Sequence, residues 1–148
     1  MSTIILVSGG FDPVHKGHVR MFKGAKKLGS MLFVAVNSNE WVKKKKGYVF
    51  MDWLERTEII EEFECVDGVF HFQDDDEGTA NNAIRRIRQI YPDDGIIFAN
   101  GGDRGEGNVP EIGVCEELEV EMRWNVGGHK IQSSSELVKK GKENKKKK

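Results

Sequence analysis

Two histidines three positions apart are the side chains of this sequence whose types and spacing best suit chemistry. His15 and His18 have Gly17 between them, and Gly9 and Gly10 lie a few residues earlier. On the first turn of a helix, this spacing places both imidazoles on one side. Glycine lets a ligand approach the backbone closely, and the free N–H groups at a helix N-terminus favour an anion. These residues in this order predict a phosphate cradle.

Other interpretations explain the histidines less well. Either histidine alone is more often a capping or surface group. A metal pair is another alternative, but no third ligand is evident, because His71 and His129 lie far away in the sequence. Other phosphate loops are excluded, since the chain has no GxxxxGK[ST] and the glycines of 102–107 do not have GxGxxG spacing. We therefore predict a phosphate site without metal ligands at residues 9–18.

The residues around this segment predict alternating strands and helices. Residues 3–7 and 31–36 are continuous apolar runs, typical of strands buried on both faces. Between them, apolar residues from Val19 to Leu28 recur at helical spacing, and Gly29 is expected to stop that helix. A strand, a helix and a strand in this order predict a parallel pair with a right-handed crossover.

The alternation continues along the chain. Asp52 is expected to begin one helix, and Thr79 another that ends before Pro92. A short final helix is expected from Ser133. Further strands are predicted at 69–72, 96–99 and 120–124. The pattern predicts the fold class: a single α/β domain, a Rossmann-like open parallel sheet with helices on both faces.

The topology also predicts where a ligand binds. Ligands of open α/β sheets lie beyond the carboxyl ends of the strands. Three informative segments fall there: 9–18 after the first strand, 100–104 after a later strand, and 132–135 before the last helix. Their convergence on one edge is stronger evidence for a site than any one of them.

The charge distribution argues against a nucleic-acid partner. The formal net charge is −1, but residues 139–148 carry +6, which leaves −7 for residues 1–138. Nucleic-acid binding needs cations clustered on a folded face. The lysine-rich residues 139–148 are predicted to be a disordered tail, with a functional basic arm as the alternative.

Composition and cysteine use favour a cytoplasmic globular protein. Apolar residues make up 38% of the chain and charged residues 32%. No apolar run approaches the ~20 residues that span a bilayer, and residues 1–20 lack the pattern of a secretory signal. Cys65 and Cys115 form no CxxC motif, so we expect two reduced cysteines that fill core space.

The segment from Gly10 to His18 resembles the GxFDxxHxGH signature of the cytidylyltransferase-like nucleotidyltransferases. That family includes glycerol-3-phosphate cytidylyltransferase and the adenylyltransferase that activates heptose 1-phosphate. The resemblance covers about residues 3–138, and we expect residues 1–138 to form the nucleotidyltransferase domain. Weaker matches follow in family order: 34–38, Glu55-Arg56, 101–103 and the serine run 133–135.

The resemblance implies a reaction and a set of roles. In this family a phosphorylated acceptor attacks the α-phosphate of a nucleoside triphosphate and pyrophosphate leaves, so catalysis rests on positioning and charge stabilisation. His15 and His18 are implied to be the catalytic residues, donating to the phosphates. Mg²⁺ is expected to arrive with the nucleotide, and a homodimer is expected. The implied nucleotide-binding residues are Gly9, Gly10, Phe11, Asp12, Gly17, Gly102, Asp103, Ser133, Ser134 and Ser135.

Four basic residues are candidates for contact with substrate phosphate. Family members place a phosphate-binding lysine in the segment of Lys43–Lys46, so Lys45 or Lys46 is expected to reach a phosphate, although a solvated loop is the alternative. Arg56 matches the family's Glu-Arg pair and is expected to grip phosphate with its planar fork, with an exposed salt bridge as the alternative. Lys130 is the fourth candidate.

The sequence departs from the glycerol-phosphate cytidylyltransferases in one segment. Those enzymes have an arginine shortly before the Ser/Thr run, whereas residues 127–132 here read Gly-Gly-His-Lys-Ile-Gln. Together with the Gly-Gly-Asp triplet at 101–103, this makes the chain more similar to sugar-phosphate adenylyltransferases. Lys130 can take the place of the arginine, so the choice of nucleotide stays open.

The sequence thus leads to a ranked set of functions. The first is a nucleotidyltransferase that uses ATP and a sugar phosphate such as heptose 1-phosphate, serving cell-surface polysaccharide synthesis. The second uses CTP and glycerol 3-phosphate or a similar alcohol phosphate. Two alternatives from other classes are a nucleotide-binding module without catalysis and a flavodoxin-like partner-binding domain that binds no triphosphate.

Overall fold

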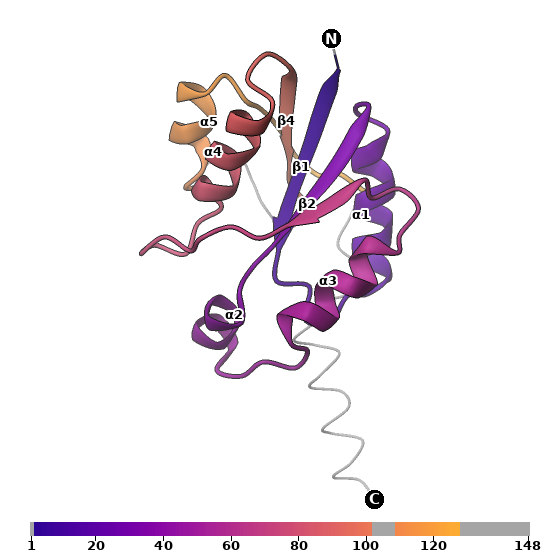
Figure 1. Cartoon of the computed structure of the whole chain (residues 1–148), viewed down its shortest axis with the longest axis vertical. Coiled ribbons are helices and arrows are strands. Elements are labelled where there is room, and N and C mark those ends of the chain that lie inside the picture. The colour runs from indigo at the N-terminus through magenta and orange to yellow at the C-terminus, as the bar shows by residue number, and fades with distance from the viewer. Residues whose placement is uncertain (1, 102–108, 128–148) are drawn as a thin grey trace, which may run out of the picture.

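A five-stranded parallel sheet forms the centre of the molecule in a computed structural model that describes residues 2–101 and 109–127 (Figure 1). The order of the strands across the sheet is β3-β2-β1-β4-β5, and every neighbouring pair is parallel. This order confirms the predicted Rossmann-like fold. The strands are β1 (Thr3–Gly9), β2 (Met31–Val36), β3 (Gly68–Phe70), β4 (Gly95–Ala99) and β5 (Glu121–Arg123).

Helices cover both faces of the sheet and one of its ends. In Figure 1, α1 and α3 lie on one side of the strands and α4 and α5 on the other, while α2 lies beyond the carboxyl ends of the strands. The helices are α1 (Lys16–Lys26), α2 (Asn39–Lys46), α3 (Trp53–Glu61), α4 (Asn81–Ile90) and α5 (Ile112–Glu117).

The central strand β1 is buried on both faces, as its continuous apolar sequence predicts. Ile4 and Leu6 belong to the core under α4 and α5, whereas Ile5 and Val7 belong to the core under α1 and α3. All four side chains have no exposed surface. Because successive side chains of a strand point to opposite faces, one unbroken apolar run supplies both cores.

The turn that returns the chain from α1 to β2 depends on Gly29. A Cβ at this position would lie 2.6 Å from the carbonyl oxygen of Thr3, so only glycine permits the close approach. The helix itself ends at Lys26, before the glycine. The backbone N–H of Ser30 then donates to the same carbonyl of Thr3, which starts β2 beside β1.

Several element boundaries agree with the sequence and a few differ. Asp52 caps α3 through Leu54 N–H, as predicted. Thr79 accepts the N–H of Asn81 at the start of α4, although Ala80 occupies the cap position itself. The lysine run of 43–46 is helical rather than a loop, because Ser38 caps α2 and Gly47, at φ 90°, ends it.

Two further predictions differ or fall outside the described residues. The strand predicted at 69–72 is the shorter β3, and α5 was not predicted because its six residues are too few to show a helical period. The final helix expected from Ser133 and the tail of 139–148 lie outside the described residues. Within 2–101 and 109–127, no helix has the length and apolar character needed to cross a bilayer.

Both cysteines are free, as predicted. Cys115 of α5 is buried against the sheet. Its burial, together with the charge of nearby Glu111, raises the pKa of its thiol to about 11. Burial also raises the pKa of the partly buried Cys65 thiol. Both thiols therefore stay protonated and serve as small apolar side chains.

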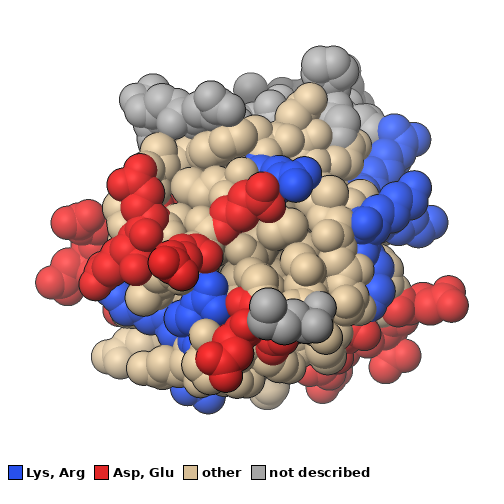
Figure 2. Space-filling view, turned by 90° about the horizontal axis from the view of Figure 1, so that it is seen from above, with Lys and Arg blue, Asp and Glu red and all other residues tan. Residues whose placement is uncertain are grey.

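The amino-terminal end of the sheet is held by Arg88 of α4. Its guanidinium donates to the carbonyl oxygens of Leu118, Glu119, Tyr91 and Asp94, at 3.1, 3.1, 3.1 and 2.7 Å. Figure 2 views the molecule from this end and shows acidic and basic side chains lying beside one another around the rim of this face. The Arg88 contacts bind the ends of α4 and α5 to the start of β4, far from the carboxyl end.

Candidate active site

The loop between β1 and α1 carries the predicted phosphate cradle at the carboxyl end of the central strand. Gly9 is the last residue of β1, and Phe11 has a positive φ of 52°, which turns the chain sharply. The Phe11 ring packs back under the loop, since a Cβ on Gly9 would lie 2.9 Å from its tip. A Cβ on Gly10 would meet the indole of Trp41 at 3.3 Å. Both glycines therefore allow the loop to fold tightly against its own side chains.

His15 and His18 cap the helix that they begin. The Nδ1 atom of His15 accepts the N–H of Gly17 at 3.1 Å, and the Nδ1 atom of His18 accepts the N–H of His15 at 3.2 Å. This reciprocal pattern is a capping box built from two histidines. It satisfies two backbone N–H groups at the start of α1 that would otherwise lack an intrahelical partner.

The capping box fixes the tautomer of both rings. A ring nitrogen that accepts an N–H carries no proton, so the neutral imidazole has its proton on Nε2. Each ring therefore turns an Nε2–H donor away from the backbone that it caps. The two rings are stacked, with centroids 3.8 Å apart and an interplanar angle of 21°. His15 and His18 thus form a matched pair of donors at a helix N-terminus.

Aromatic packing holds the His18 ring from behind. Phe11 meets it edge-on at 4.8 Å between centroids, and Phe22 lies parallel to it at 6.5 Å. Phe22 in turn contacts Phe63 at 5.6 Å, which links the ring to the core between α1 and α3. The orientation of the His18 ring is therefore set by both its hydrogen bond and its packing.

Asp12 of the motif is a structural anchor in this arrangement. The side chain is 1% exposed, and its two carboxylate oxygens accept the backbone N–H groups of Phe50 and Met51 at 2.8 and 2.5 Å. We predicted Asp12 among the nucleotide-binding residues. The structure directs its carboxylate to the backbone of the loop between α2 and α3, and a role for Asp12 in nucleotide binding stays a prediction.

Lys46 and Lys45 lie in different surroundings. Lys46, the last residue of α2, donates from Nζ to the carbonyl oxygen of Asp12 at 2.5 Å. Burial lowers the pKa of Lys46, and the charge of Asp12 partly opposes this effect. Lys45 is exposed and places Nζ 4.7 Å from the centre of the Trp41 ring. Of the two predicted lysines, Lys46 is the one at the motif.

Arg56 requires a correction. We predicted a guanidinium that grips substrate phosphate, with an exposed salt bridge as the alternative. The structure buries the side chain completely, with 0% exposed, and turns it toward backbone carbonyl groups and Asn39. Burial lowers the pKa of the guanidinium, while Asp12 and Asp52 raise it. A group enclosed in this way does not present a fork to a ligand.

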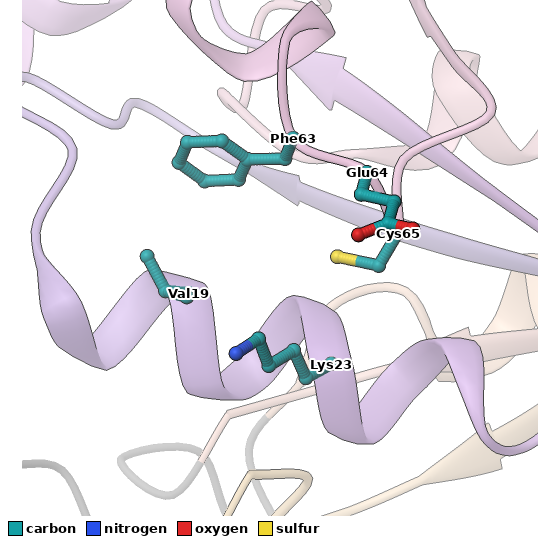
Figure 3. A pocket seen from close by; sticks show the side chains of 5 residues that line it. All are labelled: Val19, Lys23, Phe63, Glu64 and Cys65. Carbon is teal, nitrogen blue, oxygen red and sulfur yellow. The ribbon is translucent and has the colours of Figure 1, made fainter.

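The described residues also include a groove away from the histidines. It has a volume of about 420 Å³ and lies between α1 and the segment after α3. Figure 3 shows Val19 and Lys23 of α1 facing the side chains of residues 63–65 across it. Neither His15 nor His18 lines this groove.

Part of the predicted site lies outside the described residues. This applies to Gly102, Asp103, Lys130 and the serine run 133–135. Asn100, at the end of β4, is 3% exposed, and its backbone joins Arg123 and Val126. Because β1 and β4 are parallel neighbours, the segments that follow them lie at the same edge of the sheet, as the sequence predicted.

Comparison with known proteins shows the family of the chain. The cytidylyltransferase-like family matches residues 6–138. The bifunctional protein HldE of Streptomyces coelicolor is 32% identical over 117 residues, which are 78% of this chain and 23% of that protein. HldE of Haemophilus ducreyi is 33% identical over 128 residues, 85% of this chain and 23% of that protein. The chain thus spans about a quarter of the length of these curated relatives.

Solved structures share the fold at lower identity. A lipopolysaccharide core biosynthesis protein from Thermoplasma volcanium has a TM-score of 0.65 and 22% identity, covering 84% of this chain and 94% of its own. A second neighbour is a bifunctional NMN adenylyltransferase/ADP ribose pyrophosphatase from Francisella tularensis, complexed with AMP and a Mn ion. Its TM-score is 0.67 at 16% identity, and the match covers 95% of this chain and 41% of that chain. The chain belongs to the cytidylyltransferase-like family.

Proposed function

We propose that this chain transfers an adenylyl group from ATP to a sugar phosphate such as heptose 1-phosphate and releases pyrophosphate. The observation that carries nucleotidyl transfer is the stacked pair of imidazoles at the N-terminus of α1, whose Nδ1 atoms accept backbone N–H groups and so leave Nε2 as the donor. The HldE relatives and the lipopolysaccharide core biosynthesis protein support a sugar phosphate as acceptor. The Gly-Gly-Asp triplet at 101–103 supports ATP over CTP.

The reaction needs charge stabilisation more than a nucleophile from the protein. A phosphate oxygen of the acceptor attacks the α-phosphorus of the nucleotide, and the bond to the bridging oxygen of the leaving pyrophosphate breaks. Negative charge grows on the transferring group and on the leaving group, where His15 and His18 donate from Nε2. The N-terminus of α1 adds backbone dipoles of the favourable sign. No covalent intermediate with the protein is required.

Magnesium enters this proposal as part of the nucleotide substrate. Among the residues the structure describes, no three His, Cys, Asp or Glu side chains gather as metal ligands. Mg²⁺ binds few protein ligands when it accompanies substrate phosphates. The Francisella tularensis neighbour, solved with AMP and a Mn ion, supports the use of a divalent metal. We also propose that the active form is a homodimer in the cytoplasm.

A pyrophosphate-release screen tests the proposed function. ATP, CTP, GTP and UTP are each offered with a panel of sugar 1-phosphates and polyol phosphates, with Mg²⁺ and with excess EDTA. We expect turnover with ATP and a sugar 1-phosphate, and none in EDTA, because the leaving pyrophosphate needs charge neutralisation. Turnover with CTP and glycerol 3-phosphate alone would support the alternative substrate pair. Full activity in EDTA would contradict the role of the metal.

We further propose that Lys46, rather than Lys45, reaches a substrate phosphate. Its Nζ already lies at the motif, and hydrogen bonds from a charged donor contribute about 1.5–3 kcal/mol. Lys46→Ala should therefore lower kcat/KM about 10–100-fold. Lys44→Ala is the control, because Lys44 is exposed on the same helix and should give wild-type kinetics. An equal fall in kcat/KM for Lys44→Ala and Lys46→Ala would show that the lysines contribute only a general electrostatic attraction.

A further inference from the structure

Arg56 donates to four groups in three segments at the carboxyl end of the sheet. Its Nη1 donates to the carbonyl oxygens of Gly10 at 2.6 Å and Asn37 at 2.8 Å. Its Nε donates to the carbonyl oxygen of Met51 at 3.0 Å, and its Nη2 to Oδ1 of Asn39 at 2.8 Å. The side chain reaches all four from the fourth residue of α3 and has no exposed surface.

These four partners lie in the segments that surround the candidate active site. Gly10 lies in the motif after β1, and Asn37 lies directly after β2. Asn39 is the first residue of α2, which ends at Lys46, and Met51 lies in the loop before α3. The N–H of Asn37 also donates to the carbonyl oxygen of Gly9 at 2.9 Å. The guanidinium therefore sets the relative positions of the motif, the start of α2 and the loop that Asp12 holds.

The contact with Gly10 has a direct consequence for the motif. In a trans peptide the C=O and the following N–H point in opposite directions. Because the Gly10 carbonyl points to Arg56, the N–H of Phe11 points away from it. The buried guanidinium of Arg56 thus fixes the orientation of the Gly10–Phe11 peptide at the start of the cradle. A hydrogen bond from a charged donor is stronger than one between neutral groups.

We propose that Arg56 is a positioning residue for nucleotidyl transfer, which acts on the reaction through the Gly10 peptide and α2 without touching substrate. A guanidinium is required because its planar fork donates in several fixed directions at once, whereas a lysine ammonium is one point charge. The inference uses nucleotidyl transfer as one of its readouts but does not depend on the identity of the acceptor.

The test compares Arg56→Lys with Arg88→Lys. Both replace an arginine that donates to several backbone carbonyl groups, but Arg88 lies at the opposite end of the sheet. At a temperature well below unfolding, Arg56→Lys should lower kcat about 10–100-fold, as small misplacements do, with a nucleotide Kd within about threefold of wild type. Arg88→Lys should lower the unfolding midpoint and leave kcat unchanged.

Hydrogen exchange gives a second readout that needs no acceptor. Arg56→Lys should accelerate exchange at the amides of Asn37, Phe50 and Met51, which bond to Gly9 and Asp12. Arg88→Lys should accelerate it near Leu118 instead. If no acceptor supports turnover, the proposed function fails while this readout still decides the role of Arg56.

Two results would overturn the proposal. One is a large rise in the Kd or KM of a single substrate with kcat unchanged at saturation, which would make Arg56 a ligand contact. The other is wild-type kinetics or wild-type exchange at the three amides in a folded Arg56→Lys protein. If Arg56→Lys does not fold, Asn39→Ala is tested in its place. That variant keeps the guanidinium and removes one of its acceptors, the Oδ1 atom of Asn39. Asn39→Ala should then lower kcat and accelerate amide exchange in the same way but by less. Wild-type kcat or wild-type exchange in this variant would overturn the proposal.

Discussion

His18→Ala is expected to lower kcat by about 10²–10³-fold, by analogy with the loss of one oxyanion-hole donor. The variant should fold, because the aromatic neighbours of His18 remain and the loss of a capping acceptor costs about 1 kcal/mol. Its rate should fall because the removed Nε2–H is aimed at charge that appears during transfer. Steady-state kinetics with saturating nucleotide measure this loss.

Asparagine and glutamine at position 18 separate the two tasks of the ring. The Oδ1 of asparagine stands at the position of Nδ1, so His18→Asn keeps the acceptor for His15 N–H and loses the reach of Nε2. The Nε2 of glutamine stands as far from the backbone as the histidine donor, so His18→Gln keeps the donor and loses the cap. We expect wild-type stability with a slow rate for asparagine, and partial rate with lower stability for glutamine. The opposite ranking of rates would contradict the donor role.

Asp12→Asn is expected to destabilise the protein by about 1–3 kcal/mol and to slow turnover. The buried carboxylate accepts two backbone N–H groups. The asparagine amide has one oxygen and one NH₂ group, so either Phe50 N–H or Met51 N–H faces the NH₂ group and loses its acceptor. Such a loss costs about 1–3 kcal/mol. Chemical denaturation measures the change in the free energy of unfolding.

Asp67→Asn is the matched control for Asp12. Asp67 also accepts a backbone N–H, that of Leu32, but it lies near the C-terminus of α1 and its side chain is 31% exposed. Water can replace the lost partner there, so we expect a cost of about 1 kcal/mol or less and unchanged kcat. Equal losses of stability for the two variants would show that the burial of Asp12 is not what makes it an anchor.

The sequence predicted the elements whose patterns are complete within a few residues. The apolar runs of β1 and β2 indicate strands buried on both faces, and the register of the sheet confirms them. The spacing of His15 and His18 predicted two rings on one side of a helix start, which the structure shows. In these cases the local pattern and the tertiary structure favour the same conformation.

The sequence could not predict side chains whose partners come from distant segments. Arg56 sits in a helical pattern where an exposed surface residue and a buried one look alike, and its partners lie 46 and 19 residues earlier in the chain. Asp12 belongs to a recognisable motif, but its partners, Phe50 and Met51, carry no signal of their own because they donate through the backbone. Only the arrangement of the loops shows that both side chains are structural.

The central claim is that the two imidazoles act on the transition state more than on bound nucleotide. The most direct test is calorimetric nucleotide binding beside kcat on the same preparation of His18→Ala. The account predicts a nucleotide Kd within about tenfold of wild type, roughly 1.4 kcal/mol, together with the loss in kcat of about 10²–10³-fold. A collapse of nucleotide affinity with kcat preserved at saturation would contradict it.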